Sequence, residues 1–251
     1  MKTYKQYSIP VFSLIFFVIL WEGIVRLTHI ENWILPTPSA TLASLWESKQ
    51  LLLQHSVVTI VESSIGLALA VVVAWSAATA MYFSSLLKKS LYPLLVISQT
   101  IPFIALAPLL VVWFGFGLLP KIIIVALVCF FPIAVNLLDG FTSVDLSIIH
   151  HMRVLGANHR QIFRFAILPA SLPFFFSGLR IAGAYALLTA LVAEWIGATD
   201  GLGVFITRAS KSYLTDRVFA TIFVVSLISL FTVATINRIY KFATPWRIFK
   251  N

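Results

Sequence analysis

Six long apolar runs, separated by short polar segments, make up most of the chain. They cover approximately residues 9–27, 57–83, 91–114, 119–138, 172–196 and 218–240. Each run holds about 20 residues or slightly more, which is the length of a helix that crosses about 30 Å of hydrocarbon. We therefore predict an all-α integral membrane protein with six transmembrane helices, folded as a single domain over residues 1–251.

Three of the connecting segments have features of their own. Residues 30–50 carry tryptophans that suit a membrane interface and prolines that interrupt a helix, so we expect an external segment with a short interfacial helix near residues 39–53. Gly115 and Gly117 indicate a tight external turn. Residues 197–217 form another external segment, whose apolar middle could dip into the bilayer.

The longest polar segment covers residues 139–171 and contains three histidines and three arginines. A connection of this length is unlike the short turns that usually join neighbouring helices. It contains a basic amphipathic stretch, residues 147–165, whose apolar positions form one stripe of a helix with Gly156 in its interior. We predict a helix that buries this stripe against another protein, with a helix lying on anionic lipid as the alternative.

Composition supports a membrane protein and argues against a nucleic-acid-binding one. The chain is 60% hydrophobic and 11% charged, with a mean hydropathy of +0.97, whereas soluble domains carry about 25% charged residues. The net charge of +9 comes from short basic clusters between apolar runs rather than from a basic and aromatic groove. Such clusters are typical of cytoplasmic loops.

The distribution of lysine and arginine predicts the orientation. One side holds eleven of these residues, namely Lys2, Lys5, Lys88, Lys89, Arg153, Arg160, Arg164, Arg238, Lys241, Arg247 and Lys250. The other side holds at most six, namely Arg26, Lys49, Lys121, Arg208, Lys211 and Arg217. The positive-inside rule then places both termini and residues 139–171 in the cytoplasm.

The sequence carries none of the common catalytic or nucleotide-binding motifs. It lacks a G-x-x-x-x-G-K-[ST] phosphate loop, a G-x-S-x-G elbow and an H-E-x-x-H pair, so we expect no catalytic or cofactor site and no ATP hydrolysis by the chain itself. His150 and His151 point about 100° apart on a helix and have no further ligand nearby, so we expect no metal site. Cys129 lies inside an apolar run and is assigned to packing.

Polar groups inside apolar runs are costly and are therefore candidates for a translocation path. Our candidates are Glu62, Gln99, Pro102, Asn136 and Glu194. For Glu62, Gln99 and Asn136 a hydrogen bond between helices explains the residue equally well. Glu194 lies near a helix end, where interfacial hydrogen bonds also explain it. Pro102 belongs to a proline-rich stretch, residues 98–108, whose freed carbonyls need protein or a wet cavity to cover them.

The residues around Gly156 resemble a known family. Leu155-Gly156-Ala157 followed by Ile167-Leu168-Pro169 matches the cytoplasmic signature of the permeases of binding-protein-dependent ABC importers. The Glu-Ala-Ala that begins this signature is replaced by His150-His151-Met152. ILPTPSAT and SQTIPFIALAPLL are similar to the branch that imports nitrate, sulfonates, taurine and thiamine precursors, and Gln-Thr-Ile-Pro is most similar to permeases for the pyrimidine precursor of thiamine.

The resemblance implies a MetI-like fold and a particular assembly. It implies a homodimer in a bacterial inner membrane, two cytoplasmic ATP-binding subunits and an external solute-binding protein. The implied cargo is a pyrimidine precursor of thiamine, with a sulfonate, taurine, nitrate or a riboflavin-like solute as the alternative. The implied contacts with the ATP-binding subunit are His150, His151, Met152, Leu155, Gly156, Ala157, Arg160, Ile162 and Phe163.

Two other classes of membrane protein fit the sequence less well. An ion-coupled secondary transporter usually shows repeated halves with interrupted helices in matching places, whereas here the long loop divides four runs from two. A membrane-embedded enzyme would need a clustered nucleophile, acid-base pair or metal set, and the sequence shows none.

Overall fold

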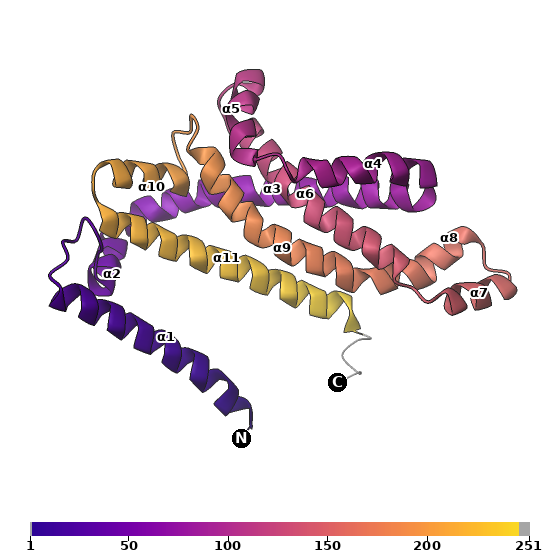
Figure 1. The fold of residues 1–251 in the computed structure, drawn as a ribbon, viewed down its shortest axis with the longest axis horizontal. Coiled ribbons are helices and arrows are strands. Elements are labelled where there is room, and N and C mark those ends of the chain that lie inside the picture. Colours follow the sequence, from indigo (N-terminus) through magenta and orange to yellow (C-terminus); the bar gives the residue numbers. More distant parts are fainter. Residues whose placement is uncertain (1, 246–251) are drawn as a thin grey trace.

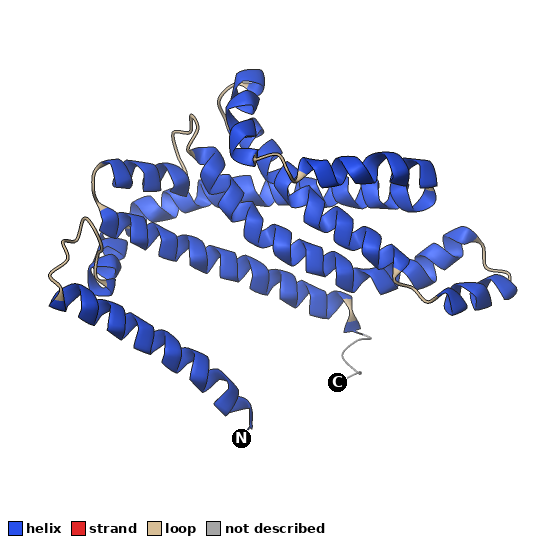
Figure 2. Cartoon of the chain, viewed as in Figure 1, coloured by secondary structure: helices blue, strands red, loops and turns tan. Residues whose placement is uncertain are grey.

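The computed structural model describes residues 2–245, with side chains from residue 12 onward. Within that range every regular element is a helix, so the prediction of an all-α protein is confirmed (Figures 1 and 2). The side chains of Lys2 and Lys5, and Arg247 and Lys250 of the predicted basic tail, lie outside the described residues.

The elements follow one another with short connections. The helices are α1 (Lys2–Leu27), α2 (Pro38–Glu47), α3 (Lys49–Phe83), α4 (Ser85–Ser98), α5 (Phe103–Phe114), α6 (Leu118–Thr142), α7 (Leu146–Val154), α8 (His159–Ile162), α9 (Leu168–Glu194), α10 (Leu202–Lys211) and α11 (Thr215–Ala243). A π-helical segment, Phe163–Ile167, joins α8 to α9.

Four helical stretches of the described chain are long and apolar enough to cross a membrane. They are Lys49–Phe83, Leu118–Thr142, His159–Glu194 and Thr215–Ala243, and α4 with α5 adds a fifth if the bent pair is one span. The predicted first run, residues 9–27, falls within α1. The total of six spans stays a prediction.

The predicted span over residues 91–114 is divided between two helices. α4 ends at Ser98, α5 begins at Phe103, and the two helices are bent by 101°. Pro102 has an extended backbone and precedes the first residue of α5. Proline lacks an N–H and disfavours a helical residue before it, which explains the break at Ile101.

The start of the second run also differs from the prediction. The interfacial helix α2 ends at Glu47 rather than near residue 53, and α3 begins at Lys49 rather than near residue 57. Ser48 joins the two helices, and its backbone N–H still bonds to the carbonyl of Ser44. α3 therefore extends beyond the apolar run and carries His55 on its first turns.

The centre of the bundle consists of α3, α6 and α9, with α11 packed against α9 (Figure 1). Gly66, Ala70, Ala74 and Ala78 recur every four residues along one buried face of α3. A side chain at Gly66 would come within 2.6 Å of the Val125 side chain on α6. Small residues thus let the helix backbones approach closely, as in other transmembrane bundles.

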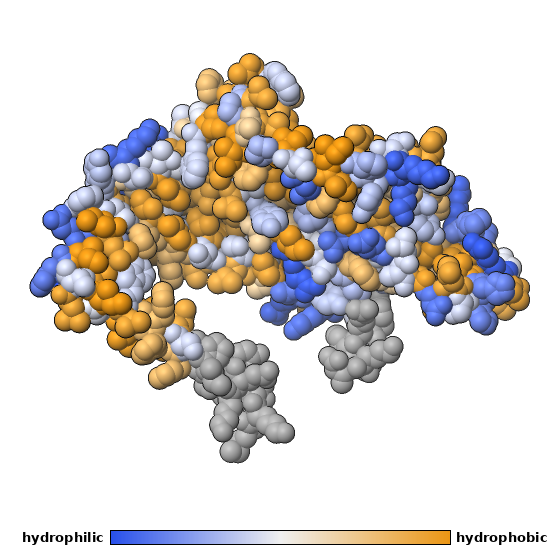
Figure 3. All heavy atoms as spheres, viewed as in Figure 1, coloured by the Kyte–Doolittle hydropathy of each residue, from blue (hydrophilic) through white to orange (hydrophobic). Residues whose placement is uncertain are grey.

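The two ends of the bundle differ in what they carry. α7 and α8 extend from one end, whereas α2 and α10 lie at the other (Figure 1). Hydrophobic side chains cover much of the middle of the visible face, and hydrophilic side chains gather toward the ends (Figure 3). We therefore expect polar contacts with partner proteins at the two ends of the bundle.

Candidate functional site

The loop at residues 139–171 is folded as two short helices and a wide turn. α7 ends at Val154, α8 spans only His159–Ile162, and the π-helical segment leads into α9. The prediction of one continuous helix over residues 147–165 is therefore wrong. The break at Gly156 explains the difference.

Gly156 ends α7 rather than lying inside a helix. Its φ is +84°, and its N–H bonds to the Arg153 carbonyl at 2.9 Å while the Ala157 N–H bonds to the Met152 carbonyl at 2.9 Å. These two bonds form a Schellman motif, whose left-handed residue is usually glycine. The conformation of the turn accounts for this glycine.

Side-chain caps fix the starts of both short helices. The Asp145 carboxylate accepts a bond from the Ser147 N–H at 2.9 Å, and this bond lowers the pKa of Asp145. At α8, Asn158 and Gln161 form a capping box, each side chain accepting from the other residue's N–H. The loop is therefore locally specified rather than irregular.

The wide π-helical turn before α9 is explained by the proline at position 169. Pro169 has no N–H, and its ring would collide with the carbonyl one turn earlier in a regular helix. The Leu168 N–H instead reaches back five residues to the Phe163 carbonyl. Such π-helical turns are often found at functional sites.

An aromatic cluster ties this turn to the bundle. Phe163 lies 5.2 Å from Tyr82, 5.0 Å from Phe83 and 5.3 Å from Phe141, measured between ring centroids. Ile162, next to it, is buried in the same core. Ile162 and Phe163 thus attach the loop to α3 and α6. The family resemblance also implied these two residues as contacts with the ATP-binding subunit.

The remaining predicted contact residues divide by exposure. His150, His151, Leu155, Gly156 and Arg160 are exposed, and Leu155 is 85% exposed. Met152 and Ala157 are half-buried against the chain's own core. Further apolar side chains stand exposed on the same loop, namely Leu146, Ile148, Val154 and Phe165. The loop therefore presents an apolar surface with basic residues around it.

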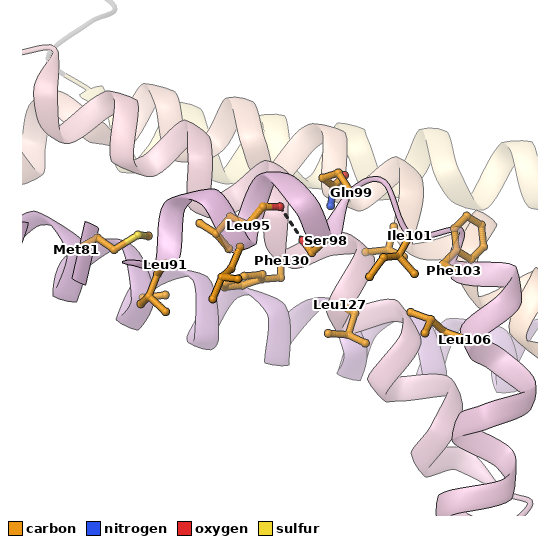
Figure 4. Close-up of a pocket in the computed structure, with 13 residues that line it drawn as sticks. Met81, Leu91, Leu95, Ser98, Gln99, Ile101, Phe103, Leu106, Leu127 and Phe130 are labelled. Atoms are coloured by element: carbon orange, nitrogen blue, oxygen red, sulfur yellow. Dashed lines mark hydrogen bonds between the residues drawn. The ribbon is translucent and has the colours of Figure 1, made fainter. Parts of the chain in front are cut away.

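The predicted path residues do not form one group. Gln99 lines a mostly apolar cavity of about 470 Å³ between α3, α4, α5 and α6, close to the bend (Figure 4). Pro102 forms the bend itself. The Asn136 amide donates to the Pro132 carbonyl of its own helix at 2.8 Å.

Glu62 and Glu194 meet in a buried polar network at the opposite end from α7. Lys121 Nζ donates to Glu62 Oε1 at 2.5 Å, and both carboxyl groups are 0% exposed. Thr59 Oγ1 donates to Glu194 Oε1 and the Gly203 N–H donates to Glu194 Oε2, each at 2.6 Å. Glu194 is the last residue of α9, and its buried carboxyl is held by hydrogen bonds within the protein, from Thr59 and Gly203.

Sequence reasoning missed three members of this network. Lys121 is in the first turn of α6, at a helix end as expected, but its burial was not predicted. Thr59 and His55 were not singled out, although they lie on the same face of α3 as Glu62, at intervals of three and four residues. That spacing was the available signal, because such residues share one side of a helix.

Residues 66–245 match the family described as binding-protein-dependent transport system inner membrane component. The formylaminopyrimidine transport permease protein ThiX of Halalkalibacterium halodurans is 36% identical over 98% of this chain and 99% of its own length. The taurine transport system permease protein TauC of Escherichia coli is 30% identical over 96% of this chain and 90% of its own length.

Among solved structures, an inward-facing form of the MetNI methionine ABC transporter has a chain with a TM-score of 0.69. That chain is 19% identical, and the match covers 79% of this chain and 98% of the other, so it supports the MetI-like fold. The family match extends over most of the chain, and the relatives that align with nearly all of it are permeases. The loop with the family signature lies at one end of the bundle. The chain belongs to the inner membrane components of binding-protein-dependent transport systems and is an ABC importer permease.

Proposed function

We propose that this permease carries a pyrimidine precursor of thiamine, of the formylaminopyrimidine type. The observation that carries the proposal is the 36% identity to ThiX over 98% of the chain. The Gln99–Pro102 stretch, which the sequence singled out for this branch, forms the bend beside the cavity of about 470 Å³. Taurine and riboflavin are the competing cargoes, after the relatives TauC and RibX.

The test is uptake by cells that express the chain with its ATP-binding subunit and binding protein. Radiolabelled formylaminopyrimidine should accumulate, and unlabelled taurine or riboflavin in excess should not reduce the uptake. Accumulation of taurine or riboflavin, with no uptake of the pyrimidine, would reject this cargo and leave the assignment to the family intact.

The energy for this transport is assigned to separate ATP-binding subunits. Family membership implies such a subunit and a solute-binding protein as partners. We infer two copies of the ATP-binding subunit and a homodimer of this chain, with both termini in the cytoplasm. Support comes from the basic residues on the loop side and from the capped, exposed α7–α8 loop.

A reconstitution experiment separates this assignment from a secondary transporter. Liposomes containing the chain alone should show no uptake under an ion gradient, because the chain has no energy source of its own. Adding the ATP-binding subunit and the binding protein should give uptake that depends on ATP. Ion-driven uptake by the chain alone would contradict the proposal.

Contact with the ATP-binding subunit is assigned to the exposed part of the loop. Leu155 and Val154 expose apolar side chains to solvent, and Arg153 and Arg160 stand beside them. An apolar surface of this kind outside the membrane is typical of a protein interface. Ile162 and Phe163 support this surface from behind.

Two substitutions at Gly156 separate backbone strain from contact. Both Gly156→Ala and Gly156→Trp strain the left-handed turn, since φ is +84°. A Cβ at Gly156 meets nothing within 4 Å in this chain, so a further loss in Gly156→Trp reports the bulk of the indole rather than a clash of its first atom. Transport should fall much further in Gly156→Trp than in Gly156→Ala, with both proteins inserted in the membrane. Equal transport in the two variants would contradict docking at this turn.

A further inference from the structure

Three ionisable groups meet inside the bundle at the end opposite α7. Glu62 comes from α3, Lys121 from α6 and Glu194 from α9; both carboxyls are 0% exposed and Lys121 is 8% exposed. The Glu62 carboxyl contacts Lys121 on one side and faces the Glu194 carboxyl on the other. Two carboxyl groups thus share one lysine.

The charges of this group do not balance when both carboxyls are ionised. Two carboxylates and one ammonium leave a net negative charge in a place closed to water. An uncompensated buried charge is strongly destabilising. Other ionisable groups near the start of α10 are His55, which is buried on α3 and accepts from the Gly201 N–H, and the exposed Asp200 and Arg208. One proton held by the carboxyl pair would make the group neutral.

The hydrogen bonds identify where such a proton fits. Three of the four carboxyl oxygens already accept a bond, from Lys121 Nζ, Thr59 Oγ1 and the Gly203 N–H. The fourth, Glu62 Oε2, is buried and has no partner. A buried acceptor without a donor is costly, and a proton between the facing carboxyls would supply that donor.

The same carboxyl group holds the start of α10. The Gly203 N–H donates to Glu194, the Leu202 N–H donates to Thr59 Oγ1 at 2.9 Å, and the Gly201 N–H donates to His55 Nδ1 at 3.0 Å. These N–H groups have no partner inside α10, because they belong to its first turn. Side chains of α3 and α9 thus replace a local cap.

The two glycines make this approach possible. A Cβ at Gly201 would overlap the Glu194 carboxyl, and a Cβ at Gly203 would overlap the Leu191 carbonyl. Gly201 also has a φ of +124°. The backbone of α10 therefore lies directly on the carboxyl group of Glu194.

We propose that Glu62 and Glu194 share one proton in the folded chain, and that this carboxyl pair, neutralised with Lys121, fastens α10 to the transmembrane bundle. Glu194 is a positioning residue for transport, since it acts through the placement of α10. The arrangement needs no metal or cofactor.

Infrared spectroscopy of the purified transporter in lipid nanodiscs at neutral pH tests the shared proton. The wild type should show the C=O stretch of a protonated carboxyl group. Glu62→Gln and Glu194→Gln should each lose this band, and Glu47→Gln on the exposed end of α2 should keep it. A wild type without the band, or a band that survives both substitutions, would overturn the proposal.

Removing the lysine gives a second test with a pH profile. In Lys121→Met the carboxyl pair needs two protons to be neutral. The same carboxyl groups are ionised in the unfolded chain at neutral pH, so folding must take up both protons. The thermal unfolding temperature of Lys121→Met should therefore fall as pH rises above neutral. Adding Glu62→Gln leaves Glu194 as the one carboxyl that needs a proton, so the pH dependence should fall to about half. The same pH slope in the single and double variants would refute the charge balance, whatever their absolute stability.

Discussion

Single small residues set the distance between the helices of the bundle. Gly66, Gly140 and Gly178 each lie where an added Cβ would meet a neighbouring helix within about 3 Å or less. Their partners are α6 for Gly66 and α9 or α6 for the other two. The absence of side chains at these points lets backbone pack against backbone, which is the main source of helix association in lipid.

Gly66→Leu should destabilise the bundle by about 1–3 kcal/mol, the usual cost of overpacking. The added side chain would press against Val125, which is fully buried and cannot move aside. Thermal unfolding in detergent measures the change. Gly23→Ala on α1 is the matched control, because a Cβ there meets nothing within 4 Å. An equal loss in both variants would contradict close packing at Gly66.

Phe163→Ala should loosen the loop at residues 139–171 from the bundle. The ring contacts Tyr82, Phe83 and Phe141, so its removal should cost on the order of 2–3 kcal/mol, less than for a fully buried phenylalanine. Transport should fall together with stability. Arg164→Ala, on an exposed neighbouring position, is the control and should leave stability unchanged.

The helices illustrate which features a sequence can predict. Apolar runs identified α3, α6, α9 and α11, because a span requires about 20 apolar residues wherever it occurs. Pro102 lies at the bend between α4 and α5, yet prolines inside α6 and α9 leave those helices unbroken. A proline breaks a helix only where nearby helices do not hold it together, and that depends on tertiary packing.

The site was predictable to a different degree. Gly156 and Pro169 marked the loop correctly, but the sequence pattern alone did not show that Gly156 ends α7. The network of Glu62, Lys121 and Glu194 joins residues up to 132 positions apart, and no local pattern pairs them. Only the packing of α3 against α6 and α9 brings these charges together.

The cap of α7 has a defined pH dependence. The Ser147 N–H holds the pKa of Asp145 below its usual value, so the folded state gains stability from the ionised carboxylate. This stability is present above the unfolded pKa and is lost as pH falls through the folded pKa. The protection factors of the α7 amides, which correct for the intrinsic pH dependence of exchange, should therefore fall at acidic pH in the wild type.

Asp145→Asn serves as the matched variant, because asparagine caps helices without a charge. The protection factors of its α7 amides should change little across the same acidic range. Asp145→Ala should exchange faster at every pH, since it has no cap. Identical acid sensitivity in the wild type and Asp145→Asn would contradict the role of the carboxylate.

The whole molecule has two chemically distinct ends, which the orientation assigns to opposite sides of the membrane. The loop of α7 and α8 carries Arg153, Arg160 and Arg164, and the other end carries α10 with Arg208 and Lys211. The excess of basic residues is the basis on which we propose that the first end lies in the cytoplasm.

Cysteine labelling in intact cells checks this orientation. Cys129→Ala removes the native thiol, which is fully buried. In that background Lys211→Cys should react with a membrane-impermeant maleimide, and Arg160→Cys should react only after the membrane is opened. The reverse pattern would invert the proposed topology.

α3 runs from one end of the bundle to the other and connects the two ends. Its 35 residues span about 50 Å at 1.5 Å per residue. Thr59 and Glu62 lie near one end of its buried face, and Met81 and Tyr82 lie at the other beside Phe163. Between them the buried positions 66, 70, 74 and 78 are glycine and alanine, which have no side-chain rotamers that could absorb a shift. α3 should therefore move as a rigid helix. A displacement of the α7–α8 loop at one end would then displace the residues that hold α10 at the other end.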